Sequence, residues 1–212
     1  GNGVQTIGVS VFSGCTALAD IEIGSSVQTI GASAFRDCKG LVSIDIAANV
    51  QEINNYAFQN CTSLASIDIP SNVQTIGEGA FLGCTALTTV TLNEGLKTIK
   101  GRAFYACPIV ALSIPNSVIT IETYYEKYAD DVYQGAFENC KKLTNIVIGN
   151  GLTNISRDTF AHCTALKSVE IGDSVVTIGE AAFSECIALV DVEIGNGVQT
   201  IGVSVFSGCT AL

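Results

Sequence analysis

The sequence contains no tryptophan, no methionine and a single histidine, and only 14% of its 212 residues are charged. Its 10 basic residues are scattered along the chain. Because nucleic acids and anionic membrane surfaces bind clustered Lys and Arg, neither is expected as a partner. With one histidine and no CxxC pair, no zinc site is expected, and nothing in the sequence indicates a cofactor.

Long apolar runs are also absent. No stretch approaches the roughly 18 consecutive apolar residues of a transmembrane helix, so no membrane span is expected. The chain opens with neither an initiator methionine nor a basic and apolar leader, so we expect a mature chain or a piece of a longer one. The hydrophobic fraction of 48% suffices for a continuous core, and the net charge of −10 favours an acidic, solvated surface.

The nine cysteines and nine phenylalanines define an internal repeat. Each Phe lies three residues before a Cys, and successive cysteines are 23 residues apart except for the interval of 33 from Cys107 to Cys140. A unit of this length cannot bury its apolar positions alone, whereas stacked units share one continuous core. The sequence therefore predicts a single repeat solenoid over residues 1–212, with about nine coils of 23 residues.

The unit around Phe81 shows the local structure expected of each coil. Phe81, Cys84 and Leu87 recur at steps of three, which predicts a short helical or 3₁₀ segment. Residues 90–92 alternate apolar, polar and apolar, which predicts a strand with one buried face, and residues 73–76 predict a second short extended segment. Stacking then places a parallel β-sheet on one face of the solenoid and the short helical segments on the other.

The pattern LxxIxI…VxxIxxxAFxxCxxL closely resembles the Treponema-type, or BspA-like, leucine-rich repeat family. In one unit its fixed positions are Leu64, Ile67, Ile69, Val73, Ile76, Ala80, Phe81 and Cys84. The resemblance covers essentially the whole chain and departs only between Cys107 and Cys140. It implies a cell-surface or secreted protein of a bacterium or mucosal protist, in a family where some members are adhesins that bind host matrix proteins.

The cysteine column predicts free thiols. Stacked cysteines have parallel Cβ vectors and Cβ atoms near 5 Å apart, whereas a disulfide requires about 3.8 Å with the side chains turned toward each other. We expect nine free thiols that behave as small buried hydrophobes and react only after denaturation.

An acidic ladder follows the outward-facing position of the predicted strands. That position reads Glu22, Asp45, Asp68, Thr91, Ser113, Val147, Glu170 and Glu193, and Asp20 and Asp191 add charge at the two ends. Stacked carboxylates repel one another, so the ladder lowers stability slightly. We interpret it as a solubilising sheet face. The alternative is a concave surface for a basic partner or for weakly held calcium.

The fifth turn departs from the repeat. It loses one residue after Cys107 and gains about eleven between Ile121 and Phe137, in an insertion at about 122–133 that holds four of the six tyrosines. Tyrosine combines a large contact area with a polar tip, which suits it to interfaces. The predicted partner-binding residues are Tyr124, Tyr125, Tyr128, Tyr133, Asp130 and Asp131 of the insertion, with the uncharged ladder positions Thr91, Ser113 and Val147. The alternative is an insertion that only covers its own coil.

No catalytic residues are predicted. His162 is the only histidine, and it precedes Cys163, whose side chain belongs to the buried column. At the equivalent position the other coils carry residues typical of a surface, so we expect His162 to be exposed. Because no acid and base pair or activated nucleophile is indicated, the chain is not expected to be an enzyme.

Residues 1–18 are identical to residues 195–212. The chain is either one period of a longer array or a chain designed with matching ends. Uncapped solenoid ends expose apolar surface and strand edges, which favours end-to-end stacking. Two functions therefore stay open: a protein-binding module of an adhesin-type surface or secreted protein, and a self-assembling element of a filament or surface layer, in which copies of the chain are the partners.

Overall fold

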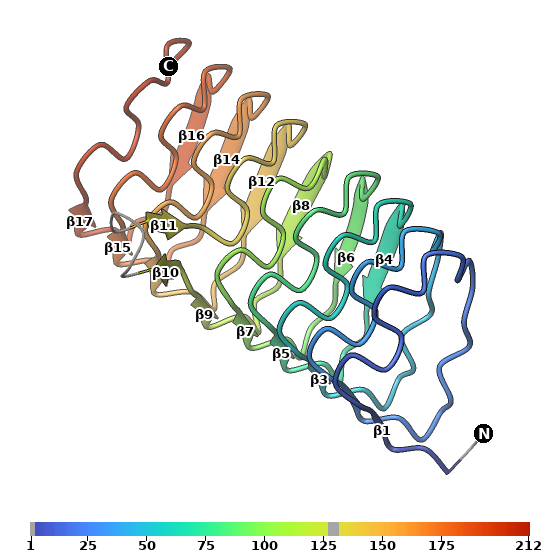
Figure 1. Ribbon diagram of the computed structural model, residues 1–212. Helices are drawn as coiled ribbons and strands as arrows, with labels where there is room; N and C mark the ends of the chain where they lie inside the picture. Colours follow the sequence, from blue (N-terminus) through green and yellow to red (C-terminus); the bar gives the residue numbers. More distant parts are fainter. Residues whose placement is uncertain (1–2, 127–131) are drawn as a thin grey trace.

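The computed structural model describes residues 3–126 and 132–212. The chain winds into a row of stacked coils, with the N- and C-termini at opposite ends of the row (Figure 1). The predicted β-solenoid with parallel sheets is confirmed. The described residues make about eight turns of about 23 residues each.

Short strands run along one side of the coils. Their bounds are β1 (Thr6–Ile7), β2 (Thr29–Ile30), β3 (Glu52–Ile53), β5 (Thr75–Ile76), β7 (Thr98–Ile99), β9 (Thr120–Ile121), β13 (Asn154–Ile155), β15 (Thr177–Ile178) and β17 (Thr200–Ile201). The first six pair in parallel in chain order, and the last three form a second parallel sheet. Isoleucine ends each strand, and it is buried in every one except β17.

Longer strands form a second side, which we call the long-strand face. It consists of β4 (Ser66–Ile69), β6 (Thr89–Leu92), β8 (Ala111–Ile114), β12 (Asn145–Ile148), β14 (Ser168–Ile171) and β16 (Asp191–Ile194). β4 pairs with β6, and β8, β12, β14 and β16 form a four-stranded parallel sheet. In β4, β8 and β12 exposed and buried residues alternate, as the sequence pattern predicts.

The phenylalanines form one column through the core. Neighbouring rings have centroids 5.0–5.7 Å apart and planes within 12° of parallel. Next to them, each cysteine after the first donates its thiol proton to the carbonyl oxygen of a phenylalanine in the preceding coil, as Cys84 does to Phe58 at 3.1 Å. All nine cysteines are free thiols, as predicted.

The segments around the phenylalanines are consecutive turns, so the prediction of short helical or 3₁₀ segments is wrong for the described residues. In each segment a residue with positive φ interrupts the helical winding, for example Tyr56 at 58° and Asn60 at 59°. Their backbone N–H groups therefore point along the solenoid and donate to Glu78 and Leu82 of the next coil, both at 2.8 Å. We call the surface formed by these segments, such as residues 56–61 and 102–107, the turn face.

Thiol accessibility gives the first testable prediction. Eight cysteines are buried, but Cys15 is exposed because no coil packs on its outer side in this chain, which corrects the prediction of nine buried thiols. Burial raises the pKa of the Cys107 and Cys186 thiols to about 12, which further slows their modification because little of either thiol is present as the reactive thiolate. We expect Ellman's reagent to modify one thiol rapidly in the native chain and the other eight only after denaturation. The Cys15→Ser variant should lack the rapid phase, and several rapid thiols in the native chain would contradict the packing.

Candidate functional site

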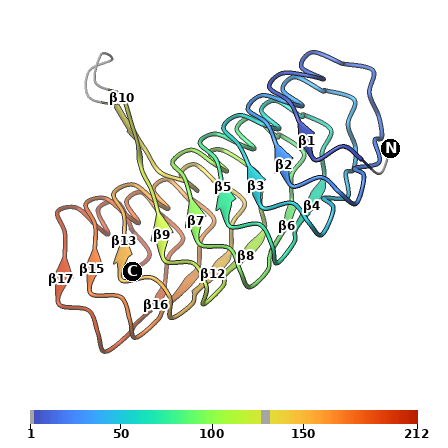
Figure 2. The ribbon, with the colours of Figure 1, turned by 90° about the horizontal axis from the view of Figure 1, so that it is seen from below.

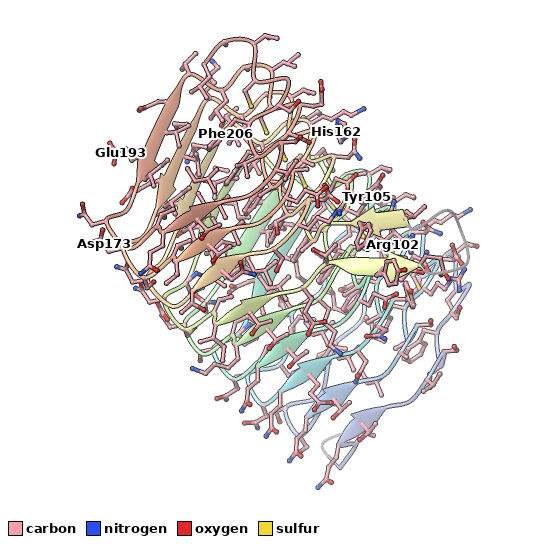
Figure 3. All side chains as sticks on the ribbon, turned by 90° about the vertical axis from the view of Figure 1, so that its left-hand side faces the viewer. Arg102, Tyr105, His162, Asp173, Glu193 and Phe206 are labelled. Carbon is pink, nitrogen blue, oxygen red and sulfur yellow. The ribbon has the colours of Figure 1, made fainter. Side chains whose placement is uncertain are left out.

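The tyrosine-rich insertion forms an antiparallel hairpin of β10 (Tyr124–Glu126) and β11 (Val132–Gln134). The hairpin leaves the solenoid between β9 and the next turn segment, and it projects away from the long-strand face (Figure 2, Figure 3). It lies where the short-strand sheet is interrupted between β9 and β13. There the Ser156 hydroxyl donates to the Ile121 carbonyl oxygen, so a side chain joins the two coils. The predicted site residues Tyr128, Asp130 and Asp131 lie outside the described residues.

Two arginines from the flanking coils hold the base of the hairpin. The Arg102 guanidinium lies 4.5 Å from the centroid of the Tyr124 ring, and that of Arg157 lies 4.1 Å from the centroid of Tyr133. Arg157 also donates to the Glu180 carboxylate at 2.8 Å. Cation–π contacts of this kind contribute about 0.5–2 kcal/mol each. The hairpin is therefore fixed to the coil before it and to the coil after it.

Among the described residues of β10 and β11, the exposed side chains are aromatic or apolar. Tyr125 and Tyr133 are register partners, and their ring centroids lie 4.8 Å apart with planes 27° from parallel. Tyr125 is 46% exposed, Tyr133 36% and Val132 38%. Because the two tyrosine rings already stack on each other, they offer contact area and lose little further conformational entropy on binding.

A half-buried carboxyl group lies where the hairpin returns to the coil. Glu138 accepts the backbone N–H of Gly135 at 3.0 Å and an N–H of the Asn139 amide at 3.3 Å. Burial, and to a smaller extent the nearby Asp158 carboxylate, raise the pKa of Glu138 from 4.5 to about 7, although the hydrogen bond from Gly135 and the Arg102 charge oppose the rise. These contacts assign Glu138 to anchoring the hairpin.

The raised pKa of Glu138 predicts a pH-dependent stability. Between pH 4.5 and 7 the folded chain holds a proton that the unfolded chain releases, so the stabilisation present below pH 4.5 is lost as the pH rises through 7. We expect this carboxyl to lower the free energy of unfolding by about 1–2 kcal/mol over that range, since solvent screens its exposed part. Urea unfolding at several pH values should show a flatter profile for Glu138→Gln. The exposed Glu170→Gln control should keep the decline, and an equally steep decline in Glu138→Gln would contradict the assignment.

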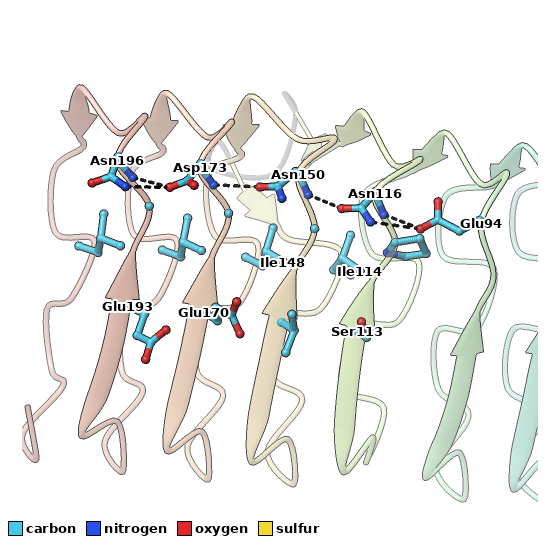
Figure 4. Close-up of a pocket in the computed structure, with 17 residues that line it drawn as sticks. Glu94, Ser113, Ile114, Asn116, Ile148, Asn150, Glu170, Asp173, Glu193 and Asn196 are labelled. Atoms are coloured by element: carbon cyan, nitrogen blue, oxygen red, sulfur yellow. Dashed lines mark hydrogen bonds between the residues drawn. The ribbon is translucent and has the colours of Figure 1, made fainter.

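The long-strand face carries a groove of about 460 Å³ across the ends of β8, β12, β14 and β16 (Figure 4). Glu170 and Glu193, which are register partners on β14 and β16, line it together with Ser113 and Val147. A second groove, of about 510 Å³, includes Asp45, Asp68 and Thr91 in its lining. The acidic ladder therefore borders both of these grooves.

Side chains at the turns that line the first groove form a hydrogen-bonded ladder, drawn as dashed lines in Figure 4. The side-chain oxygen of Asn150 accepts the backbone N–H of Asp173 at 3.0 Å, and the Asp173 carboxylate accepts that of Asn196 at 2.8 Å. Glu94 begins the ladder by accepting the backbone N–H of Asn116 at 3.1 Å. These polar groups join the turns of successive coils, so their role is structural.

The structure separates the predicted site residues into two groups. Thr91, Ser113 and Val147 are exposed on the long-strand face, whereas the hairpin projects from the opposite side (Figure 3). Every predicted acidic-face residue is exposed: Asp20, Glu22, Asp45, Asp68, Glu170, Asp191 and Glu193. The hairpin tyrosines and the uncharged ladder positions thus do not form one site, and a binding role for either group stays a prediction.

His162 is exposed on the turn face, as predicted. Within residues 3–126 and 132–212, no three His, Cys, Asp or Glu side chains are grouped so that they could hold a metal ion. In the same ranges no helix is long and apolar enough to cross a bilayer. No role was predicted for Arg102 or Arg157. The sequence did offer a signal, because two of the three arginines of the chain lie on either side of the insertion.

Comparison with known proteins identifies relatives of this fold. The family model described as a BspA type leucine rich repeat region matches residues 5–131 and 130–212. A leucine rich cell surface protein from Faecalibacterium prausnitzii is 31% identical, with a TM-score of 0.58; the match covers 99% of this chain and 63% of that protein. The chain thus spans less than two thirds of that relative's length. No curated protein matches.

Two other solved structures support the same architecture. The T. pallidum leucine rich repeat protein is 29% identical over 92% of this chain and 78% of its own, with a TM-score of 0.70. A leucine-rich repeat protein from Bacteroides ovatus is 21% identical over 100% of this chain and 70% of its own, with a TM-score of 0.63, and at that identity it shows the fold alone.

Proposed function

Because the chain belongs to the BspA-type leucine-rich repeat family, we propose that it is a non-enzymatic protein-binding module of a cell-surface or secreted adhesin-type protein. The partner is a host or matrix protein, and the β10–β11 hairpin carries the site that binds it. The observation that carries the proposal is the projecting hairpin with its exposed, stacked Tyr125 and Tyr133.

The contrast between the hairpin and the repeat supports this assignment. In a solenoid the repeated positions maintain the stack, and insertions supply the distinctive surface. Interfaces gain most of their affinity from a few aromatic anchors, and anchors that are already held lose less entropy on binding. The contacts of Arg102 and Arg157 with the hairpin provide that preorganisation. The F. prausnitzii relative, described as a cell surface protein, supports the location.

Substitution on the hairpin tests the proposal. The double variant Tyr125→Ser, Val132→Ser removes exposed apolar surface and keeps the arginine contacts of Tyr124 and Tyr133. By surface plasmon resonance against a panel of purified extracellular matrix proteins, we expect one or more to bind the native chain and the variant to lose affinity by about tenfold or more.

The matched control is Val110→Ser, Ile119→Ser, which removes exposed apolar side chains that do not belong to β10 or β11. It should bind like the native chain, and both variants should unfold at the native temperature. Retained affinity in the hairpin variant would remove the hairpin from the site, and a panel without any binder would contradict the adhesin-type role.

End-to-end assembly into a filament or surface layer stays a second prediction. It depends on the identity of residues 1–18 with residues 195–212.

A further inference from the structure

A pocket of about 380 Å³ lies on the turn face, between the coil that lacks a residue and the coil that follows it. It is lined by Tyr105, Ala106, Pro108, Asn139, Lys141 and Lys142. None of these residues belongs to β10 or β11, and none faces the long-strand grooves.

The pocket arises from the one-residue deletion. Only Pro108 separates Cys107 from the buried Ile109, whereas in the next coil both Lys141 and Lys142 separate Cys140 from its buried leucine. The shorter connection leaves a hollow beside the longer one. The regular coils have two residues at this position, so stacking does not by itself produce such a pocket.

One wall of the pocket is aromatic and held in place. The Asn139 amide donates to the Tyr105 hydroxyl oxygen at 3.0 Å, and the backbone N–H of Ala106 donates to the Glu138 carbonyl oxygen of the next coil at 2.9 Å. Because the amide supplies the donor, the Tyr105 hydroxyl hydrogen stays available for an acceptor on a ligand. Pro108 and Ala106 add an apolar surface beside it.

The opposite rim carries two ammonium groups. Lys141 and Lys142 are exposed, and within the described part of the chain neither forms a salt bridge. They are adjacent cations in a chain with a net charge of −10. The polar groups at this rim are donors, which favours a ligand with an anionic acceptor.

We propose that this pocket binds the carboxylate-bearing sugar unit of an acidic glycan. The volume falls at the small end of the roughly 300–1,000 Å³ typical of small-ligand sites, which suits one sugar ring. The ring packs on Tyr105 and Pro108, its hydroxyl groups bond to the Tyr105 hydroxyl and the Asn139 amide, and its carboxylate lies against Lys141 and Lys142. The site is independent of the hairpin, so the hairpin variant described above should retain it.

A matched pair of ligands tests the pocket. Methyl β-glucuronide and methyl β-glucoside share a sugar ring and differ in the carboxylate. In saturation-transfer difference NMR with the full chain, we expect the glucuronide to bind and the glucoside to give no signal. The variant Lys141→Gln, Lys142→Gln should bind the glucuronide about tenfold more weakly or not at all, because each ammonium contributes a charge-assisted contact.

Two control variants separate the pocket from general charge effects. The double variant Lys97→Gln, Lys167→Gln removes the same charge from exposed lysines elsewhere and should keep native affinity. The double variant Lys141→Arg, Lys142→Arg keeps both positive charges and should also bind with native affinity. Equal binding of glucoside and glucuronide, no binding of either, or unchanged affinity in the Lys141→Gln, Lys142→Gln variant would overturn the proposal. Binding of a triglutamate peptide without binding of the glucuronide would overturn it too, because the ligand would then be an acidic peptide.

Discussion

Replacing Phe81 with Ala is expected to lower the free energy of unfolding by about 3–5 kcal/mol. The Phe81 ring is fully buried and stacks on Phe58 at 5.2 Å and on Phe104 at 5.0 Å. Its removal opens a cavity between two coils that the backbone cannot close, because inter-coil hydrogen bonds fix the spacing on the strand and turn faces. Urea denaturation followed by circular dichroism measures the loss.

The matched control is Phe12→Ala. Phe12 is only half-buried and has a stacked neighbour on one side, Phe35. We expect less than half of the effect of Phe81→Ala. Equal losses at the two positions would show that stability does not depend on continuity of the column.

Replacing Gly95 with Ala is expected to cost about 3 kcal/mol or more. Gly95 has a φ of 115°, which L-residues rarely adopt, and an added Cβ would overlap the carbonyl oxygen of Ser71 in the neighbouring coil. Its backbone N–H also donates to the Ser117 hydroxyl at 2.8 Å, so the turn cannot shift without breaking a contact between coils. Thermal and urea unfolding measure the effect.

The variant Gly14→Ala distinguishes the cost of an unfavourable φ from the cost of steric overlap with a neighbouring coil. Gly14 also has a positive φ, of 77°, but a Cβ there would meet no atom within 4 Å. We expect a cost of about 1 kcal/mol, which is the conformational part alone. If Gly95→Ala were as mild as Gly14→Ala, coil spacing at this turn would not be fixed.

Most of the fold could be predicted from the repeat, because each side chain packs on its equivalent in the next coil. The spacing of Phe81 and Cys84 located the core, and the alternation around Thr91 located the long strands. The steps of three were misleading, because consecutive turns share that spacing with a helix. Residues with a left-handed backbone conformation, such as Tyr56, make these segments consecutive turns and not a helix. A tyrosine in a sequence does not indicate a positive φ.

The candidate site was predictable only in part. The interval of 33 residues located the insertion, and its tyrosines indicated an interface. Its direction depends on contacts with Arg102 and Arg157, which are distant in sequence. The sequence therefore left open whether the insertion reaches the strand face that carries Thr91. The pocket at Tyr105 was missed, although the deletion after Cys107 in one coil and the Lys141–Lys142 pair in the next marked its place.

Deleting residues 124–134 tests the central claim most directly. The deletion leaves Ile-Glu-Thr-Gly-Ala-Phe, which matches the regular unit Ile-Gly-Glu-Gly-Ala-Phe at 76–81, so the coil should close normally. The control Glu170→Gln, Glu193→Gln removes two carboxylates from the long-strand face. For a matrix protein that binds the native chain, surface plasmon resonance should show binding lost on deletion and kept in the control, with both chains folded. A folded deletion variant that binds with native affinity would contradict the hairpin as the partner-binding site.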